Sequence, residues 1–407
     1  MRKRHSSRMS QDSRTRAKDA PQWLTPLSGT SGNILLLGLA ALVAGMCVLP
    51  AGPSFNPSKP YQYLLAFTLY LPALVIGFRQ PGRWWVLLSR PPMMWLVALM
   101  AWSAVTLAWT DASRPVDEAL RLLAILVFLF AWYHTIGSDA QRLQRLLLAC
   151  SCMLAMAAIA AMVRLKSAPP ADGRMSGLGV MANPNLFAAA LSMGVLWLVP
   201  WRMSNAARNV SRCALALILL VGVFLTGSRS ATAALLVALM ILLWLANDRI
   251  HRGLAAALAL MALTTAALEY SDILARGWSF RPAILVRSWE LFVQRPWTGH
   301  GLGATMLLPV EGHLHTHAHN LTMQLGFELG IPGVALWWIA WCIVGHRAWR
   351  VRADVVGRLT VGSWVFATLL VQFDLPHLLD SPRPGWLMLW FPFAMSLSLP
   401  APHLEDP

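Results

Sequence analysis

Charged residues are scarce in this chain of 407 residues. Asp, Glu, Lys and Arg make up 13% of it, whereas hydrophobic residues make up 57%. Soluble globular domains carry about 25% charged residues, so the composition excludes an ordinary soluble protein. Runs such as LLLGLAALVAGMCVL and MMWLVALMAWSAVTLAW are long enough, or nearly so, to cross a hydrocarbon core of about 30 Å as helices. The sequence therefore predicts an all-α polytopic membrane protein.

Hydropathy divides the chain into about twelve transmembrane helices within one unit, residues 33–400. The predicted helices span about 33–50, 61–78, 93–109, 119–136, 146–163, 183–200, 213–226, 230–246, 253–268, 320–344, 359–375 and 385–400.

Acidic residues are few, and the formal net charge is +15. The basic residues do not form one patch, so their distribution indicates membrane topology and no nucleic-acid partner. The connections expected on the side of the N-terminus carry 14 Lys and Arg against 3 Asp and Glu, whereas the other side is close to balanced. The positive-inside rule then puts both termini in the cytoplasm. Residues 1–32 are predicted to be a solvated basic tail, and 401–407 a short second tail.

A cleavable signal peptide and a disulfide framework are both missing from the pattern. The first apolar run starts after about thirty polar residues and has no small-residue cleavage site of the usual kind. The five cysteines fall within or at the ends of predicted helices, where small core residues are expected.

One connection is much longer than the rest. Residues 269–319 form a loop of about fifty residues on the predicted outer side, and long loops are usually functional or disordered. The patterned stretch RPAILVRSWELFVQRPW and the glycine turn GHGLG predict an ordered loop with a short helix on the membrane face. We therefore expect an active site that faces the periplasm.

Several cations lie on this predicted outer side. Arg229 is in the turn FLTGSRSATAALL, with almost no polar loop around it. Arg281 and Arg287 are in the long loop, and Arg174 precedes the NPN stretch at 183–185. Guanidinium groups match phosphate oxygens, so these residues could form a phosphate or diphosphate pocket at the lipid interface. The alternatives are an interfacial Arg229 whose charge reaches water, and separate solvated charges elsewhere in the loops.

Four histidines alternate between 313 and 319. In an extended segment they would share one face and could chelate zinc or copper, but no cysteine or carboxylate stands at the spacing that would complete a structural metal site. A solvated loop explains His313 and His315. His319 comes directly before an apolar helix, where an imidazole can accept a proton near neutral pH as a general base. Glu328 is expected to be buried and paired.

Four motifs together resemble the O-antigen ligases and the related O-antigen polymerases and bacterial protein O-oligosaccharyltransferases. The motifs are GVMANPNLFAAAL, LTGSRSATAALL, SFRPAILVRSWELFVQRPWTGHGLG and HAHNLTMQLGFELGIPG, in that order. The family's arginines carry over to Arg229 and Arg281, and its histidine to His319. Arg287 matches no family position, so its role rests on its location, and Arg174 is a further candidate for the same anion.

The resemblance implies a membrane glycosyltransferase with a GT-C-like architecture at the bacterial inner membrane. It would transfer O-antigen from undecaprenyl diphosphate to a sugar hydroxyl of lipid A-core oligosaccharide. We hypothesise one displacement with inversion and no cofactor. We also predict that no metal is needed, because Glu290 and Glu311 are isolated in the loop and no acidic pair stands near His319. The sequence has no glycine-rich phosphate loop that would indicate a nucleotide-sugar donor. The tripeptide GLG at 301–303 is too common in proteins to count as one.

Other functions stay open at this point. A polymerase or a protein O-oligosaccharyltransferase would share the motifs, although the latter generally carry extra C-terminal material. A transporter would also have about twelve helices, but it should show charges at mid-membrane and broken helices in repeated halves.

Overall fold

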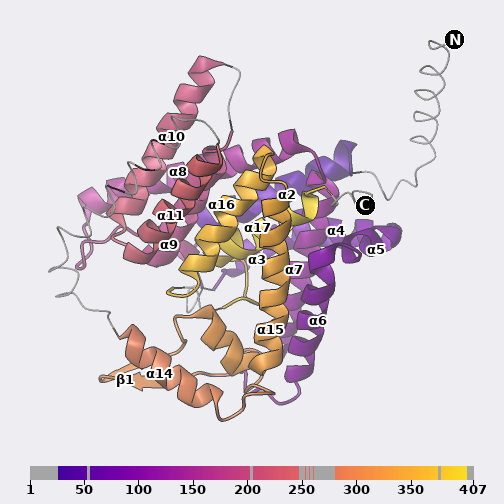
Figure 1. Cartoon of the computed structure of the whole chain (residues 1–407), viewed down its shortest axis with the longest axis vertical. Coiled ribbons are helices and arrows are strands. Elements are labelled where there is room, and N and C mark those ends of the chain that lie inside the picture. The colour runs from indigo at the N-terminus through magenta and orange to yellow at the C-terminus, as the bar shows by residue number, and fades with distance from the viewer. Residues whose placement is uncertain are drawn as a thin grey trace.

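The computed structural model describes residues 26–52, 56–201, 205–246, 280–374 and 377–400, together with Gly253, Ala256 and Leu260. Most of the predicted N-terminal tail and most of the predicted helix 253–268 lie outside these residues. The first part of the long loop, 269–279, and the C-terminal tail lie outside them entirely. Within them the fold is almost entirely helical, as predicted (Figure 1).

The first half of the chain forms a series of apolar helices. Their bounds are α2 Gly29–Val48, α3 Lys59–Leu65, the π-helical turn η3 Ala66–Tyr70, α4 Leu71–Arg79, α5 Gly82–Leu88, α6 Pro91–Thr106, α7 Pro115–Ile136, α8 Ala140–Ser167 and the 3₁₀ turn η4 Gly179–Met181.

The second half continues the bundle and adds a region at one end of it. Its elements are α9 Pro184–Leu198, α10 Ala206–Leu225, α11 Arg229–Leu245, α14 Arg281–Phe292, β1 Leu308–Val310, β2 His313–His315, α15 Leu321–Arg350, α16 Val355–Leu370 and α17 Pro384–Ser398.

Eleven of the predicted helices coincide with helices in the described part of the chain. By length and composition, six of the described helical segments can cross a membrane, or seven if the pair α5 and α6, bent by 98°, counts as one span. The shorter apolar helices α9, α11 and α16 fall below that length. The chain is therefore an integral membrane protein, and the figure of twelve spans stays a prediction.

Aromatic side chains fill the centre of the bundle. Phe391 of α17 stacks on Trp197 of α9 with ring centroids 5.3 Å apart, and Trp132 of α7 meets it edge-on at 5.0 Å. These rings are fully buried. Burial of such large apolar surfaces fixes how α7, α9 and α17 lie against one another.

Helix α15 has two parts, separated by a kink at Gly330. Gly330 has φ 67° and ψ −170°, which glycine tolerates, and Pro332 follows it. A Cβ at Gly330 would lie 2.5 Å from the carbonyl oxygen of Trp297, and the Ile331 amide donates to the carbonyl of Pro296. The kink therefore anchors the end of the long loop against α15.

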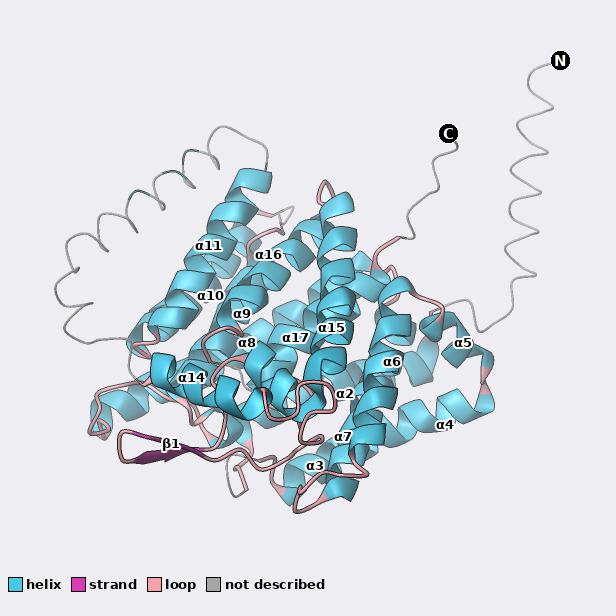
Figure 2. Cartoon of the chain, turned by 60° about the horizontal axis from the view of Figure 1, so that its bottom comes forward, coloured by secondary structure: helices cyan, strands magenta, loops and turns pink. Residues whose placement is uncertain are grey.

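The described part of the long loop covers one end of the bundle (Figure 2). The predicted loop helix is confirmed as α14. The strands β1 and β2 form an antiparallel hairpin in which Leu308 faces His315 and Val310 faces His313, a feature that the sequence did not predict. The glycine turn is confirmed too, since Gly299, Gly301 and Gly303 all have positive φ.

Candidate active site

A buried carboxylate, Asp374, lies at the centre of a polar cluster beside the long loop. Its Oδ2 accepts hydrogen bonds from the Ser230 hydroxyl at 2.7 Å and from the Arg281 guanidinium at 2.8 Å. Its Oδ1 accepts from the Asn185 amide at 3.1 Å, and the Nδ1 of His319 lies 3.9 Å from the same oxygen. We call these five residues the Asp374 cluster.

The groups around Asp374 come from the starts of four helices. Asn185 lies in the first turn of α9, Ser230 in that of α11, and Arg281 begins α14, while His319 directly precedes the cap residue of α15. A helix N-terminus carries partial positive charge from its unpaired amides. The four ends therefore reinforce the arginine and make this a site suited to anions.

The local sequence explains why these helices begin there. The side chain of Asn183 accepts hydrogen bonds from the backbone amides of Asn185 and Leu186, and Pro184 occupies the first helical position. The Asn320 side chain accepts from the amide of Met323 in the same way. The motif residues of α9 and α15 are thus helix caps that fix the side chains beside them.

Asp374 is held in its charged form by its neighbours. Burial by itself raises the pKa of this carboxyl group. His319, Arg281 and Ser230 lower the pKa by a larger amount, so the pKa of Asp374 lies below its ordinary value. A charged Asp374 can orient both Arg281 and His319.

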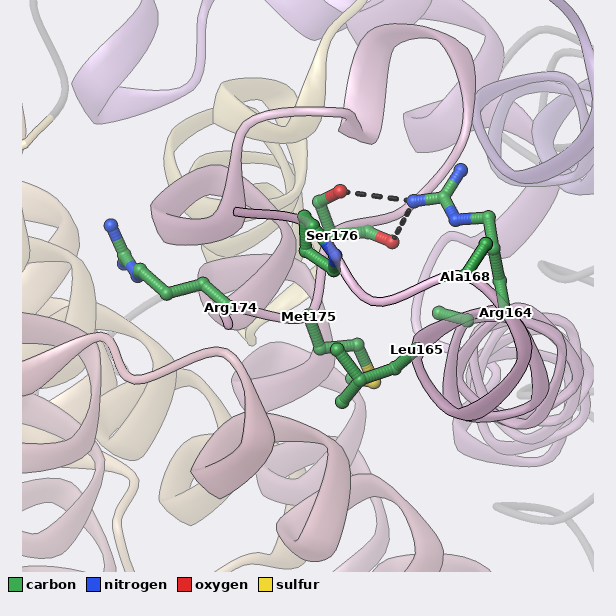
Figure 3. A pocket seen from close by; sticks show the side chains of 8 residues that line it. Arg164, Leu165, Ala168, Arg174, Met175 and Ser176 are labelled. Atoms are coloured by element: carbon green, nitrogen blue, oxygen red, sulfur yellow. Dashed lines mark hydrogen bonds between the residues drawn. The ribbon is translucent and has the colours of Figure 1, made fainter. Parts of the chain in front are cut away.

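Arg174 joins the cluster from the connection between α8 and α9. Its guanidinium donates to the side chain of Asn185 and, at 2.8 Å, to the carbonyl of Thr226 just before α11. Figure 3 shows Arg174 extending to the opposite side from Arg164, which bonds Ser176. A small cavity of about 110 Å³ lies along this connection.

His319 adopts a backbone conformation that is uncommon for a residue with a side chain. Its φ is 50°, in the small left-handed region. Its ring contacts that of His317 at a tilt of 58°, with centroids 4.0 Å apart. Burial, followed by the neighbouring imidazoles, lowers the pKa of His317 to about 3, so His317 is neutral and cannot compete for a proton near neutral pH.

A second polar cluster surrounds Asp380, in the same connection between α16 and α17. Arg383 lies 3.2 Å and Arg121 3.8 Å from its carboxylate. Arg121 also bonds Glu118 at 2.6 Å. We call these four residues, together with Glu328 and His377, the Asp380 cluster.

The pair of Glu328 and His377 completes the Asp380 cluster. Glu328 is buried and accepts from Gln324 at 2.7 Å, and one of its oxygens is 3.6 Å from His377. Burial by itself lowers the pKa of His377. Glu328 and Asp380 raise the pKa by a larger amount, so it lies above its ordinary value. The expectation of a buried and paired Glu328 is therefore confirmed.

The structure brings together three of the five predicted site residues, namely His319, Arg281 and Arg174. Arg229 is exposed and begins α11, directly before Ser230. Arg287 does not join them, because it is exposed and pairs with Glu290 one turn along α14 at 2.7 Å.

Three residues of the Asp374 cluster, namely Asp374, Ser230 and Asn185, were not predicted as site residues. The predicted helix 359–375 would have placed Asp374 inside the membrane, but α16 ends at Leu370 and Asp374 lies in the connection that follows. A charged residue within an apparently apolar helix was the available signal.

The alternating histidines form a chain of ring contacts. His313 and His315 lie in β2 near Phe280, and the rings of His315 and His317 both approach that of His319, with centroids 6.1 and 4.0 Å away. Within the described ranges, no group of three or more His, Cys, Asp or Glu side chains is arranged to hold a metal ion.

Comparison with known proteins agrees with the motifs. Residues 214–338 match the family model described as O-Antigen ligase. The chain resembles the O-antigen ligases. A protein of Pseudomonas aeruginosa named O-antigen ligase is 27% identical to it over 372 residues, which cover 90% of each chain. The O-antigen ligase match spans Ser230, Arg281 and His319, whereas Asn185 and Asp374 lie outside residues 214–338.

Proposed function

We propose that this protein is an O-antigen ligase. It transfers O-antigen polysaccharide from undecaprenyl diphosphate to a sugar hydroxyl of lipid A-core oligosaccharide at the periplasmic face of the inner membrane. The observation that carries the proposal is the convergence of Arg281, His319 and four helix N-termini on one buried carboxylate.

The donor diphosphate binds at this end of the bundle. Arg281 uses one nitrogen to bond Asp374, and its side chain is 34% exposed, so its other donors can reach a phosphate oxygen. We assign two more cations to the same anion, namely Arg229, the first residue of α11, and Arg174, which bonds Asn185 in the first turn of α9. Together with the helix ends, these cations stabilise the charge that develops on the leaving diphosphate.

His319 is the general base. Asp374 lies beside Nδ1, which leaves Nε2 for the acceptor hydroxyl. In one displacement the hydroxyl oxygen bonds the anomeric carbon, the bond from that carbon to the diphosphate oxygen breaks, and the proton moves to His319. The product anomer is inverted, and undecaprenyl diphosphate leaves with the electron pair.

The proposed reaction uses no metal. Glycosyltransferases that use a divalent ion hold it with carboxylates and water, whereas the single carboxylate of the Asp374 cluster is already bonded to Arg281 and Ser230. Guanidinium groups neutralise the diphosphate instead.

The deciding experiment is transfer by the purified protein. Protein in lipid vesicles is mixed with lipid-linked O-antigen and lipid A-core, and the expected product is lipopolysaccharide that carries O-antigen. Longer lipid-linked chains with no ligated product would identify a polymerase, and glycan on an added protein acceptor would identify an oligosaccharyltransferase. Either outcome would refute the ligase.

A further inference from the structure

Helix α14 and the residue after it carry an apolar face that is exposed in the described part of the chain. The exposed fractions are 43% for Leu285, 58% for Val286, 52% for Trp289 and 50% for Val293. At 100° per residue these four side chains lie within one sector of about 100°. Trp297, just beyond the helix, is 67% exposed.

The other two sides of α14 are accounted for. Ile284 and Ser288 are buried, and Ile284 packs in a small core with the hairpin residue Leu308 and with Phe327 of α15. Arg287 and Glu290 form an exposed ion pair on the third side. The helix therefore presents one sector to the protein, one apolar sector and one charged sector, an arrangement typical of helices that lie in a membrane interface.

The chain on both sides of α14 is tied to the ends of two helices of the bundle. At the start of α14, Arg281 and the first-turn residue Ser230 of α11 bond the same carboxylate. Ten residues beyond the end of α14, the Leu302 amide donates to Thr106, the last residue of α6. Figures 1 and 2 both show α14 at one end of the bundle, beside β1.

We propose that α14 is an interfacial helix whose apolar sector is inserted into the lipid leaflet beside the active site. Trp289 and Trp297 anchor it at the depth of the headgroups, where tryptophan is enriched in membrane proteins. The first residue of this helix is Arg281, so the leaflet itself would fix the height of that guanidinium above the membrane.

A spin-label scan tests this inference without any assay of transfer. The exposed residues Cys152, Cys213 and Cys342 are replaced by Ser, while Cys47 and Cys150 are buried and stay. Single cysteines are then placed at positions 285, 287, 289, 290 and 293, labelled, and the protein is reconstituted in vesicles of phosphatidylethanolamine and phosphatidylglycerol. Collision of each label with oxygen, which concentrates in lipid, is compared with collision with a water-soluble nickel chelate.

The expected ratio of oxygen to nickel accessibility is several-fold higher at 285, 289 and 293 than at 287 and 290. Nickel accessibility at 289 equal to that at 290 would show a solvated face and overturn the proposal. Low accessibility of 289 to both reagents would show that protein covers the face, and would overturn it as well. Neither outcome depends on whether the protein is a ligase.

Discussion

Two aspartates six residues apart, Asp374 and Asp380, sit in the same connection between α16 and α17 and organise opposite kinds of polar cluster. Around Asp380, three carboxylates are matched by two arginines and a histidine, and the side chains of Glu118 and Asp380 are only 11% and 12% exposed. Around Asp374, one carboxylate meets an arginine, a histidine and four helix N-termini.

In the proposed function, the difference is that between a structural network and a binding site. A balanced set of charges satisfies itself, so the Asp380 cluster can fix the positions of helices without a ligand, although its His377 is 37% exposed. The Asp374 cluster has an excess of donors, and its Arg281 and His319 stay 34% and 28% exposed. An excess of exposed positive charge at an interface is completed by an anion from outside the protein.

The largest effect is expected at His319. His319→Ala should reduce transfer by about 100-fold or more, the usual contribution of a general base, with expression and membrane insertion near normal. His313→Ala is the matched control, because His313 lies in β2 beside Phe280, and it should keep its activity. The test is the amount of ligated product formed by each purified variant. Full transfer by His319→Ala would show that His319 is not the general base.

Exchange of the two aspartates tests the comparison directly. Asp374→Asn weakens the bond that orients Arg281 and removes the charge 3.9 Å from His319. Hydrogen bonds to charged groups are worth about 1.5–3 kcal/mol, so transfer should fall roughly tenfold to a hundredfold while the melting temperature changes little. Asp380→Asn should instead lower the melting temperature, because loss of one charge from a buried pair costs roughly 3 kcal/mol or more of stability. The transfer rate of the protein that remains folded should change little. If both variants lose only stability, the Asp374 cluster is structural too.

The arginines should require shape as well as charge. Arg281→Lys and Arg229→Lys keep a cation but lose the paired planar donors, and each should lower transfer by about tenfold, the equivalent of one such bond. Arg287→Lys is the control from the same helix and should behave as wild type, since Arg287 pairs with Glu290. Wild-type rates in Arg281→Lys would reduce its role to that of a general charge.

A pH titration should reveal the half-buried His317. In the folded protein its pKa is lowered from 6.5 to about 3, so the unfolded chain binds a proton at this residue that the folded protein does not. Stability should therefore fall as the pH drops from about 6.5 toward 3. In detergent, the melting temperature of His317→Gln should fall less steeply over that range than that of wild type. Equal slopes would contradict the half-buried neutral histidine, and His313→Gln serves as control.

No effect is expected from a chelator. Purified protein should transfer glycan at the same rate in excess EDTA, because guanidinium groups and helix ends carry the neutralising charge in the proposed site. Activity that disappears in EDTA and returns with one added divalent ion would instead assign a metal to the donor diphosphate.

Long apolar helices and short motifs were predictable from the sequence, because each is a local property. Hydropathy placed eleven helices with ends within seven residues of those observed, and the motifs singled out Arg281 and His319. Asp374 was not predictable in the same way. Its role depends on contacts with residues up to 189 positions away, and a single charge did not outweigh the apolar run that precedes it.

The hairpin and the kink were missed for a related reason. The strands β1 and β2 are three residues each, too short for a clear alternation. Gly330 and Pro332 are residues that often break helices, but α15 resumes after the kink. The carbonyl of Pro296 accepts from the Ile331 amide there, and the carbonyl of Trp297 packs against Gly330.

The spread of the Asp374 cluster along the chain has a consequence for synthesis. Asn185, Ser230, Arg281 and His319 emerge from the ribosome in that order, and the carboxylate that joins them comes last, in the connection before α17. A nascent chain inserted as far as α15 already holds every proposed cation and the proposed base, but it lacks the carboxylate that joins Asn185, Ser230 and Arg281. The enzyme would thus become competent only when its final helical hairpin has entered the membrane, so partly translocated chains would not act on the lipid-linked donor.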